Sequence, residues 1–224
     1  EIRDMTQVIN RYRTDVSAPL MIDSTDAVVL EEALKLCQGK SIINSINLED
    51  GEDRFETVVP LAKKYGASLV VGCIDEDPED GMAVTVERKL EIATRSHELL
   101  TQKYSIPEQD LIFDPLVFPV GTGDQKYSAS AVATIDGVRA IAETFPHCNT
   151  TLGISNVSFG LPPAGREVLN SVFLYHCIQA GLSMAIVNSE RMQRYKEAED
   201  HFREAVKLDS KLQARRAFSM GPLR

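Results

Sequence analysis

The chain has 224 residues, of which 43% are hydrophobic and 25% charged, a composition typical of a soluble globular protein. Its formal net charge of −9 argues against a nucleic-acid partner, because phosphate binding requires clustered Lys and Arg. No apolar run approaches the ~20 residues that a membrane-spanning helix needs, and no signal peptide opens the sequence. The four cysteines lie far apart without a CxxC pair, which predicts reduced thiols in a cytoplasmic protein and indicates neither a disulfide framework nor a metal site.

An amphipathic helical pattern opens the chain, and short β-rich runs then alternate with helical patterns as far as residue 188. Most of the strands are nearly continuous apolar runs, and such strands alternating with helices predict a parallel sheet covered by helices. The predicted strands are residues 19–22, 41–45, 68–74, 111–113, 151–155 and 184–187. The predicted helices are residues 27–36, 54–65, 84–103, 130–144 and 166–180.

A polar residue stands at the end of every predicted strand. These residues are Asp23, Asn44, Asp75, Asp114, Asn156 and Asn188. A doubly wound sheet concentrates its site at one switch point, whereas a barrel gathers the carboxyl ends of all its strands around one mouth. Asp and Asn are also common after strands as helix caps and turn residues, and any one of these positions alone is better explained in that way. Their occurrence after all the strands favours the barrel.

The predicted fold is α/β, a (β/α)8 TIM-type barrel that is partial, because the pattern supplies strands 3 to 8 only. We expect residues 1–190 to form this incomplete barrel. Residues 191–224 have a highly charged helical pattern, similar to the second helix of a tetratricopeptide repeat but better explained as a closing amphipathic helix with a tail. An incomplete barrel exposes two sheet edges. We therefore expect the chain to bind a partner, to form a homodimer or to be unstable.

Three carboxylates and three amides at one mouth do not suit phosphate, which requires positive charge and backbone N–H groups. They could hold Mg²⁺ or Ca²⁺, although metal loops usually bring several ligands from one short segment. No His, Cys or Ser recurs with a partner as a nucleophile–base pair. The set matches a flat heterocycle edged with N–H donors, such as a pterin, because carboxylates accept paired N–H bonds and amides both donate and accept.

Long motifs carry a specific resemblance that runs from about Pro19 to Asn188 in unbroken order. They read PLMIDST, SIINSINLEDGEDRF, FDPLVFPVGTGD, LGISNVSFGLP and NSVFLYHCIQAGLSMAIVN. The chain resembles the pterin-binding module of cobalamin-dependent methionine synthases. The resemblance implies a methyltransferase barrel that binds 5-methyltetrahydrofolate at its mouth and presents the N5-methyl group to Co(I) cobalamin, which another domain or chain supplies.

The resemblance also assigns the site residues. It implies that Asp23, Asn44 and Asp114 contact the pterin ring. Asp75 lines the same mouth in a more indirect role, and Asn188 closes the ring of residues from the last strand.

Asn156 matches the asparagine placed near N5 and is the predicted catalytic residue. Methyl leaves a tertiary amine only when N5 is protonated or strongly hydrogen-bonded, and a neutral amide can meet N5 in either protonation state as charge develops. Arg166 could meet the glutamate tail of the folate, since a guanidinium suits carboxylates, or could be a solvated residue of the first helical turn.

The sequence lacks the first two barrel units, a homocysteine-binding module and a cobalamin module. We therefore expect it to be inactive as an isolated fragment and to depend on cobalamin- and homocysteine-binding domains elsewhere. Two alternatives stay open at this point. One is a dihydropteroate synthase-like transferase, which would need a basic residue on a late strand. The other is a non-catalytic folate-binding or remnant barrel whose C-terminal helix binds a partner.

Overall fold

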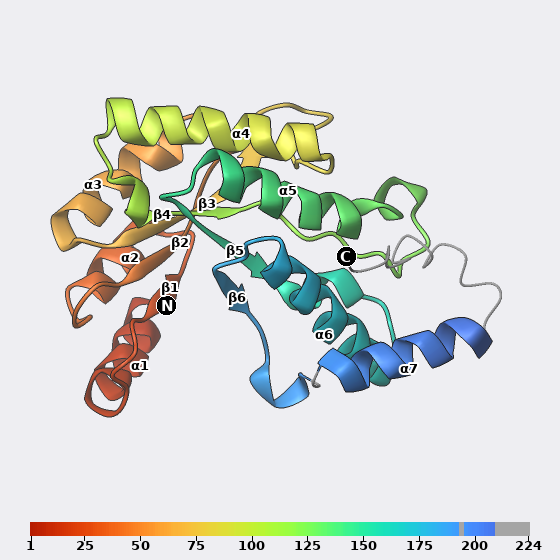
Figure 1. The fold of residues 1–224 in the computed structure, drawn as a ribbon. Coiled ribbons are helices and arrows are strands. Elements are labelled where there is room, and N and C mark those ends of the chain that lie inside the picture. Colours follow the sequence, from red (N-terminus) through yellow and green to blue (C-terminus); the bar gives the residue numbers. More distant parts are fainter. Residues whose placement is uncertain (193–194, 209–224) are drawn as a thin grey trace. The chain divides into compact units, whose positions relative to one another are not determined.

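A computed structural model describes residues 1–192 and 195–208 (Figure 1). Residues 209–224, the last part of the helix and tail predicted at 191–224, lie outside these residues. By its internal contacts the chain divides into two compact units, each of which is described by itself. The first unit comprises residues 1–82, 91–114 and 145–149, and the second comprises residues 83–90, 115–144 and those from 150 onward.

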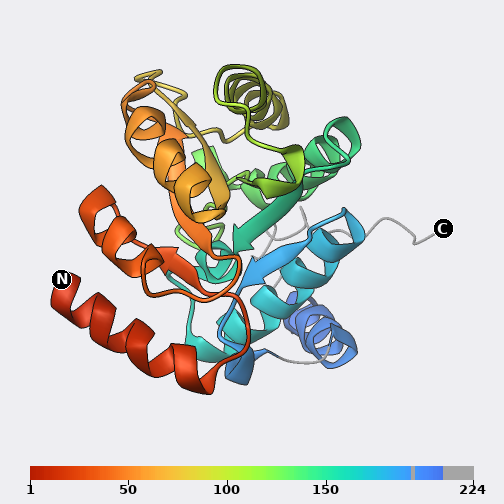
Figure 2. The same cartoon turned by 90° about the vertical axis from the view of Figure 1, so that its left-hand side faces the viewer.

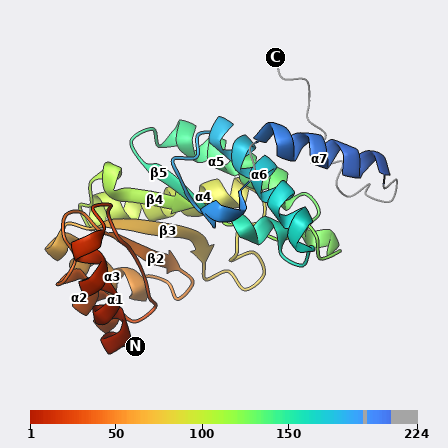
Figure 3. The same ribbon diagram turned by 90° about the horizontal axis from the view of Figure 1, so that it is seen from below.

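The first unit is a parallel sheet of four strands that pair in chain order, β1-β2-β3-β4. Figure 3 shows β2, β3 and β4 side by side. The strands are β1 (Met21–Asp23), β2 (Ile42–Leu48), β3 (Ser68–Asp75) and β4 (Leu111–Asp114). The helices are α1 (Ile2–Asp15), α2 (Ala27–Leu34), α3 (Asp53–Tyr65), the later part of α4 (Val86–Glu98), the π-helical η1 (Leu99–Lys103) and the 3-10 turn η2 (Glu108–Asp110).

Local chemistry explains where these elements begin and end. Asp26 is the N-cap of α2, and its Oδ1 accepts a hydrogen bond from the backbone N–H of Val28 at 2.8 Å. Gly66 ends α3 in the left-handed conformation, with a φ of 67° that glycine adopts without steric cost. Nearly every residue of β3 is buried, as expected of a strand covered on both faces. The amphipathic α1 packs against α2, as Figure 2 also shows.

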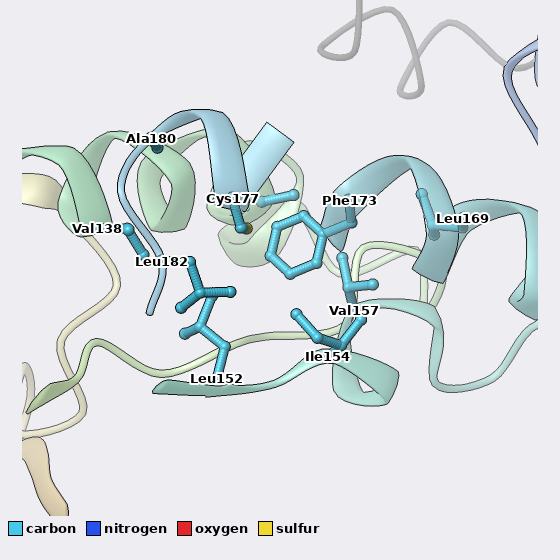
Figure 4. Packing of buried hydrophobic residues seen from close by; sticks show 10 residues of the cluster. Val138, Leu152, Ile154, Val157, Leu169, Phe173, Cys177, Ala180 and Leu182 are labelled. Carbon is cyan, nitrogen blue, oxygen red and sulfur yellow. The ribbon is translucent and has the colours of Figure 1, made fainter. Parts of the chain in front are cut away.

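The second unit contains the parallel pair β5 (Asn149–Gly153) and β6 (Met184–Ile186), of which β5 begins at the last residue of the first unit. Its core is an apolar cluster between these strands, α5 and α6, with Leu152, Ile154, Phe173 and Leu182 at its centre (Figure 4). The other elements are η3 (Gln125–Tyr127), α5 (Ser130–Thr144), η4 (Ile154–Ser158), α6 (Pro163–Gln179), η5 (Ser189–Arg191) and α7 (Tyr195–Leu208).

The predicted alternation of strands and helices is confirmed, and the predicted helix that follows residue 188 is α7, which packs against α6. Several boundaries were wrong, and α6, for example, begins at Pro163, three residues before the predicted start. Strand β2 continues to Leu48, because Ile46 and Leu48 are buried after the polar pair at 44 and 45. The predicted helix at 84–103 begins at Val86 and changes to π-helix after Glu98. Strand β5 lies two residues earlier than predicted.

Within the described residues, no helix is long and apolar enough to cross a membrane.

Candidate functional site

Asp23 and Asn44 lie side by side on the sheet of the first unit. Asp23 is the last residue of β1 and is paired in register with Asn44 of β2. In parallel strands, residues in register project to the same face, so this carboxylate and this amide are neighbours. The side chain of Asp23 is exposed and that of Asn44 is half-buried, which leaves both polar groups accessible.

The prediction that Asn44 ends its strand was wrong, because β2 continues beyond it. The register of β2 against β3 shifts between Ile43 and Ile46, and the Asn44–Ser45 peptide bond in this stretch is cis. Asn44 therefore lies within β2, at the level where β1 ends.

Arg54 of α3 holds together the two segments that carry Asp23 and Asn44. Its guanidinium donates hydrogen bonds to the backbone oxygens of Ser24 at 2.9 Å, Thr25 at 2.5 Å and Ser45 at 3.3 Å. Partial burial lowers the pKa of Arg54, although an arginine stays charged at any physiological pH. Sequence reasoning missed this residue because its partners are carbonyl groups of other segments, for which the sequence carries no signal.

Asp75, the last residue of β3, is buried within its own loop. Its Oδ1 accepts a hydrogen bond from the backbone N–H of Asp77 at 3.2 Å, and its Oδ2 lies 3.8 Å from Arg95 Nη1. The same guanidinium forms a paired contact with Glu76, at 2.9 and 2.8 Å, and this contact raises the pKa of Arg95. These contacts suit the indirect role predicted for Asp75, which stays a prediction.

Asp114 ends β4, where it is half-buried and in register with Gly72. In the second unit, the chain that follows it is anchored by Lys89, whose side chain is fully buried. Lys89 Nζ donates to the backbone oxygens of Ala83, at 2.7 Å, and Pro115, and lies 5.2 Å from the centre of the Phe118 ring.

Lys89 was also missed by sequence reasoning, although here the sequence does carry a signal. The residue occupies the same helix face as Ile92, Ala93 and Ser96, which are all buried. A lysine on the buried face of an amphipathic helix is rarely accommodated without dedicated partners. Gly137 makes room for its stem, since a Cβ there would stand 2.7 Å from Lys89 Cδ.

Asn156 lies in η4, directly after β5, and its side chain is exposed. Contrary to the prediction, it does not follow the last strand residue directly, because β5 ends at Gly153 and the first two residues of η4, Ile154 and Ser155, intervene. The amide is close to the backbone of that strand end, since Asn156 Nδ2 lies 3.2 Å from the point where a Cβ on Gly153 would stand.

Arg166 and Asn188 line one pocket of about 340 Å³ within the second unit. Arg166 donates from Nε to Ser158 Oγ at 3.1 Å and from Nη2 to the backbone oxygen of Ser155 at 3.2 Å. Asn188 Oδ1 caps η5 by accepting from the backbone N–H of Glu190 at 3.2 Å. The residues that line this pocket are Ile154, Ser155, Pro163, Arg166, Glu167, Asn170, Ile186, Val187, Asn188 and Met192.

Two of the cysteines, Cys148 and Cys177, do not suggest nucleophilic chemistry. Burial, assisted by the charge of Glu108, raises the pKa of the Cys148 thiol to about 12. Burial also raises the pKa of Cys177 far above its usual range. A thiol becomes a nucleophile when its pKa is lowered, so neither of these two groups is activated as a nucleophile.

Comparisons with solved structures identify the fold. A dihydropteroate synthase from Thermus thermophilus superposes with a TM-score of 0.61 at 21% sequence identity, over 92% of this chain and 80% of that one. A Yersinia pestis dihydropteroate synthase structure gives a TM-score of 0.61 at 14% identity, over 93% of this chain and 77% of that one. At these identities the likeness concerns the fold alone, and it confirms the predicted α/β class of the partial (β/α)8 type.

Comparisons of sequence identify the family. The methionine synthase of Mycobacterium tuberculosis is 39% identical over 194 residues, which are 85% of this chain and 16% of that protein. The methionine synthase of Mycobacterium leprae gives the same identity and coverage. The chain thus spans about a sixth of the length of these relatives. A family model described as "Pterin binding enzyme" matches residues 1–188, and the chain belongs to this family.

Proposed function

We propose that the chain is the pterin-binding module of a cobalamin-dependent methionine synthase. It binds 5-methyltetrahydrofolate and presents the N5-methyl group for transfer to Co(I) cobalamin. The identity of 39% to the mycobacterial methionine synthases over 85% of the chain supports this assignment. Cobalamin and homocysteine are held by other domains, so no residue of this chain is assigned to either.

The pairing in register of Asp23 with Asn44 is the observation that carries the proposal. A carboxylate accepts two N–H bonds from the aminopyrimidine edge of a pterin, and the neighbouring amide serves a ring atom that donates or accepts. Arg54 supports this geometry, because it fixes the backbone next to both residues. In the proposal Asp114 also contacts the ring, and Asp75 acts indirectly through its loop.

Asn156 is proposed to act on N5. Its exposed amide can donate to N5 or accept from a protonated N5, and the hydrogen bond strengthens as the methyl group departs. Cobalamin, when bound by its own domain, supplies the methyl acceptor. Asn188 and Arg166 line the pocket of the second unit. In the proposal, the guanidinium of Arg166 binds the carboxylate tail of the folate there.

Isothermal calorimetry with 5-methyltetrahydrofolate tests the proposal. Asp23→Asn keeps the size of the side chain but removes the charged acceptor, which weakens a charge-assisted pair by about 1.5–3 kcal/mol. We expect folate affinity to fall roughly tenfold or more. Asp53→Asn, on the exposed first turn of α3, is the matched control and should bind as the parent chain does.

Absence of folate binding by the parent chain would contradict the proposal and favour a remnant barrel. Binding that is unchanged in Asp23→Asn would show that the pterin lies elsewhere. The alternative of a dihydropteroate synthase is separated by supplying a pterin pyrophosphate with 4-aminobenzoate, for which no condensation is expected.

A further inference from the structure

Three potential metal ligands of the first unit lie together, two of them just before the amino ends of β4 and β5. They are His97 near the end of α4, Glu108 at the start of η2 before β4, and Cys148 directly before β5. Their ligand atoms all lie within 4.8 Å of one another, and His97 Nε2 is 2.7 Å from Glu108 Oε1. The proposed pterin residues occupy the carboxyl ends of the strands, so this cluster belongs to a different place in the fold.

The surroundings hold the side chain of His97 and the backbone of Cys148 in position. The imidazole of His97 stacks on Phe145 with 4.4 Å between ring centres and 19° between planes, and Phe145 in turn packs on Phe113. The backbone N–H of Cys148 donates to the oxygen of Phe145 at 3.0 Å, which closes the turn before β5. The side chain of His97 is 17% exposed and that of Glu108 is 38% exposed, so an ion could enter from solvent beside Glu108.

We propose that His97, Glu108 and Cys148 bind one divalent transition-metal ion of the Zn²⁺ type, with water as the fourth ligand. Imidazole nitrogen, thiolate sulfur and carboxylate oxygen are the donors that Zn²⁺ takes in proteins. The sulfur and imidazole ligands disfavour Mg²⁺ and Ca²⁺, which prefer oxygen alone. Three protein ligands with one open position give a site that exchanges its metal with solvent.

The geometry requires one modest adjustment. Metal–ligand bonds of about 2.0–2.3 Å place tetrahedral ligand atoms roughly 3.5 Å apart. Glu108 is the more exposed member of the pair it forms with His97, so rotation of its carboxylate can open their hydrogen bond to that separation. His97 stays fixed by the stacked phenylalanine.

Sequence spacing gives no sign of this site, because each ligand comes from a different segment and only the packing of the first unit brings them together. The simpler interpretation is a hydrogen-bonded His–Glu pair beside a thiol that only fills space. The two interpretations differ in one measurable respect, which is whether the sulfur bonds to a metal ion.

Titration of the 224-residue chain with Co²⁺ tests the proposal, because Co²⁺ reports a thiolate ligand through an intense sulfur-to-metal absorption band. We expect this band to saturate at one equivalent in the parent chain and to be absent in Cys148→Ser and Cys148→Ala. His97→Gln should weaken Co²⁺ binding by more than the roughly 10- to 100-fold that loss of an outer hydrogen-bond partner costs. Competition with Zn²⁺ should bleach the band.

Cys37→Ser is the matched control, since Cys37 is a half-buried cysteine of the same unit that does not belong to the cluster. It should retain the full band, and circular dichroism should show that each variant is folded. Absence of the band in the parent chain, or its persistence in either Cys148 variant, would overturn the proposal. Neither result depends on folate binding, so the proposed function stands or falls separately.

Discussion

Gly153 leaves just enough space for the amide of Asn156. A Cβ at this position would stand 3.2 Å from Asn156 Nδ2, which is closer than an ordinary van der Waals contact. The backbone at Gly153 has a φ of −77°, so alanine is conformationally allowed and the only conflict is with the amide. The substitution Gly153→Ala therefore displaces the proposed catalytic group while it preserves the strand.

For Gly153→Ala we expect the single-turnover rate of methyl transfer to Co(I) cobalamin to fall about tenfold, equal to about 1.4 kcal/mol in the barrier. Folate affinity should change little, because a group that acts mainly in the transition state contributes little to ground-state binding. Gly165→Ala is the control, since nothing lies within 4 Å of a Cβ there. An unchanged rate in Gly153→Ala would remove Asn156 from the chemistry.

At the scale of elements, the order of strands and helices could be predicted because apolar runs indicate buried strands and a period of about 3.6 residues indicates helices. Strand ends could not be predicted as well. Strand β2 contains the polar pair Asn44 and Ser45, which interrupts the apolar run and predicts an end that the structure does not have. Burial of Ile46 and Leu48 continues the strand, and that burial depends on neighbours that only the fold provides.

For the candidate site, the sequence could name residues at or near the ends of strands, because the carboxyl ends of parallel strands are expected at one edge of a sheet. The role of these residues in binding stays a prediction. Arg54 could not be named, because its partners are backbone carbonyl groups of distant segments, such as that of Ser24. Lys89 was missed although its place on the buried face of a helix is a signal, and what the sequence hides is the identity of its carbonyl partners. The sequence specifies which residues are polar but not which carbonyl group each will meet.

Arg54 is the element-scale test of the pterin site, because it links α3 to the segments after β1 and within β2. Arg54→Lys keeps the charge but replaces the guanidinium, whose three nitrogens each reach one carbonyl group, by a single nitrogen atom that cannot occupy all three positions. We expect folate affinity to fall about tenfold, measured by calorimetry. Arg139→Lys, on the exposed face of α5, should bind normally, and equal affinity in both variants would refute the linking role.

The contact between α6 and α7 should weaken in acid. Burial lowers the pKa of His176 on α6, and Glu199 on α7 opposes this shift only in part. The unfolded chain therefore binds more protons than the folded one below the ordinary histidine pKa of 6.5. Stability is retained above this pH and falls as the pH drops through it toward the lower folded value.

Urea unfolding measured between pH 8 and pH 5 by circular dichroism checks the expectation, over a range that brackets the ordinary histidine pKa of ~6.5. His176→Gln should flatten the acid side of the stability curve, because glutamine does not titrate. His147→Gln, at an exposed position, is the matched control and should leave the curve unchanged. A curve that stays equally steep in His176→Gln would assign the acid sensitivity to other groups.

At the scale of the whole molecule, the chain matches 16% of the length of the mycobacterial methionine synthases, so its proposed partner domains belong to the rest of such a protein. In a single protein, linkage gives neighbouring domains an effective concentration of about millimolar. A separate chain must instead meet the cobalamin domain by diffusion. We therefore expect methyl transfer by this chain to require an added Co(I) cobalamin domain and to rise linearly with the concentration of that domain.

Stopped-flow measurement of methylcobalamin formation, with the chain saturated by 5-methyltetrahydrofolate, follows this reaction directly. The rate should rise in proportion to the cobalamin domain in the micromolar range, because two separate chains meet by diffusion and lack the effective concentration of about millimolar that linkage provides. Asp23→Asn at saturating folate should retain most of the rate, since its defect lies in binding. If the chain methylated free cobalamin as fast as the domain-bound form, the proposal that methyl transfer requires a cobalamin-binding domain would be wrong.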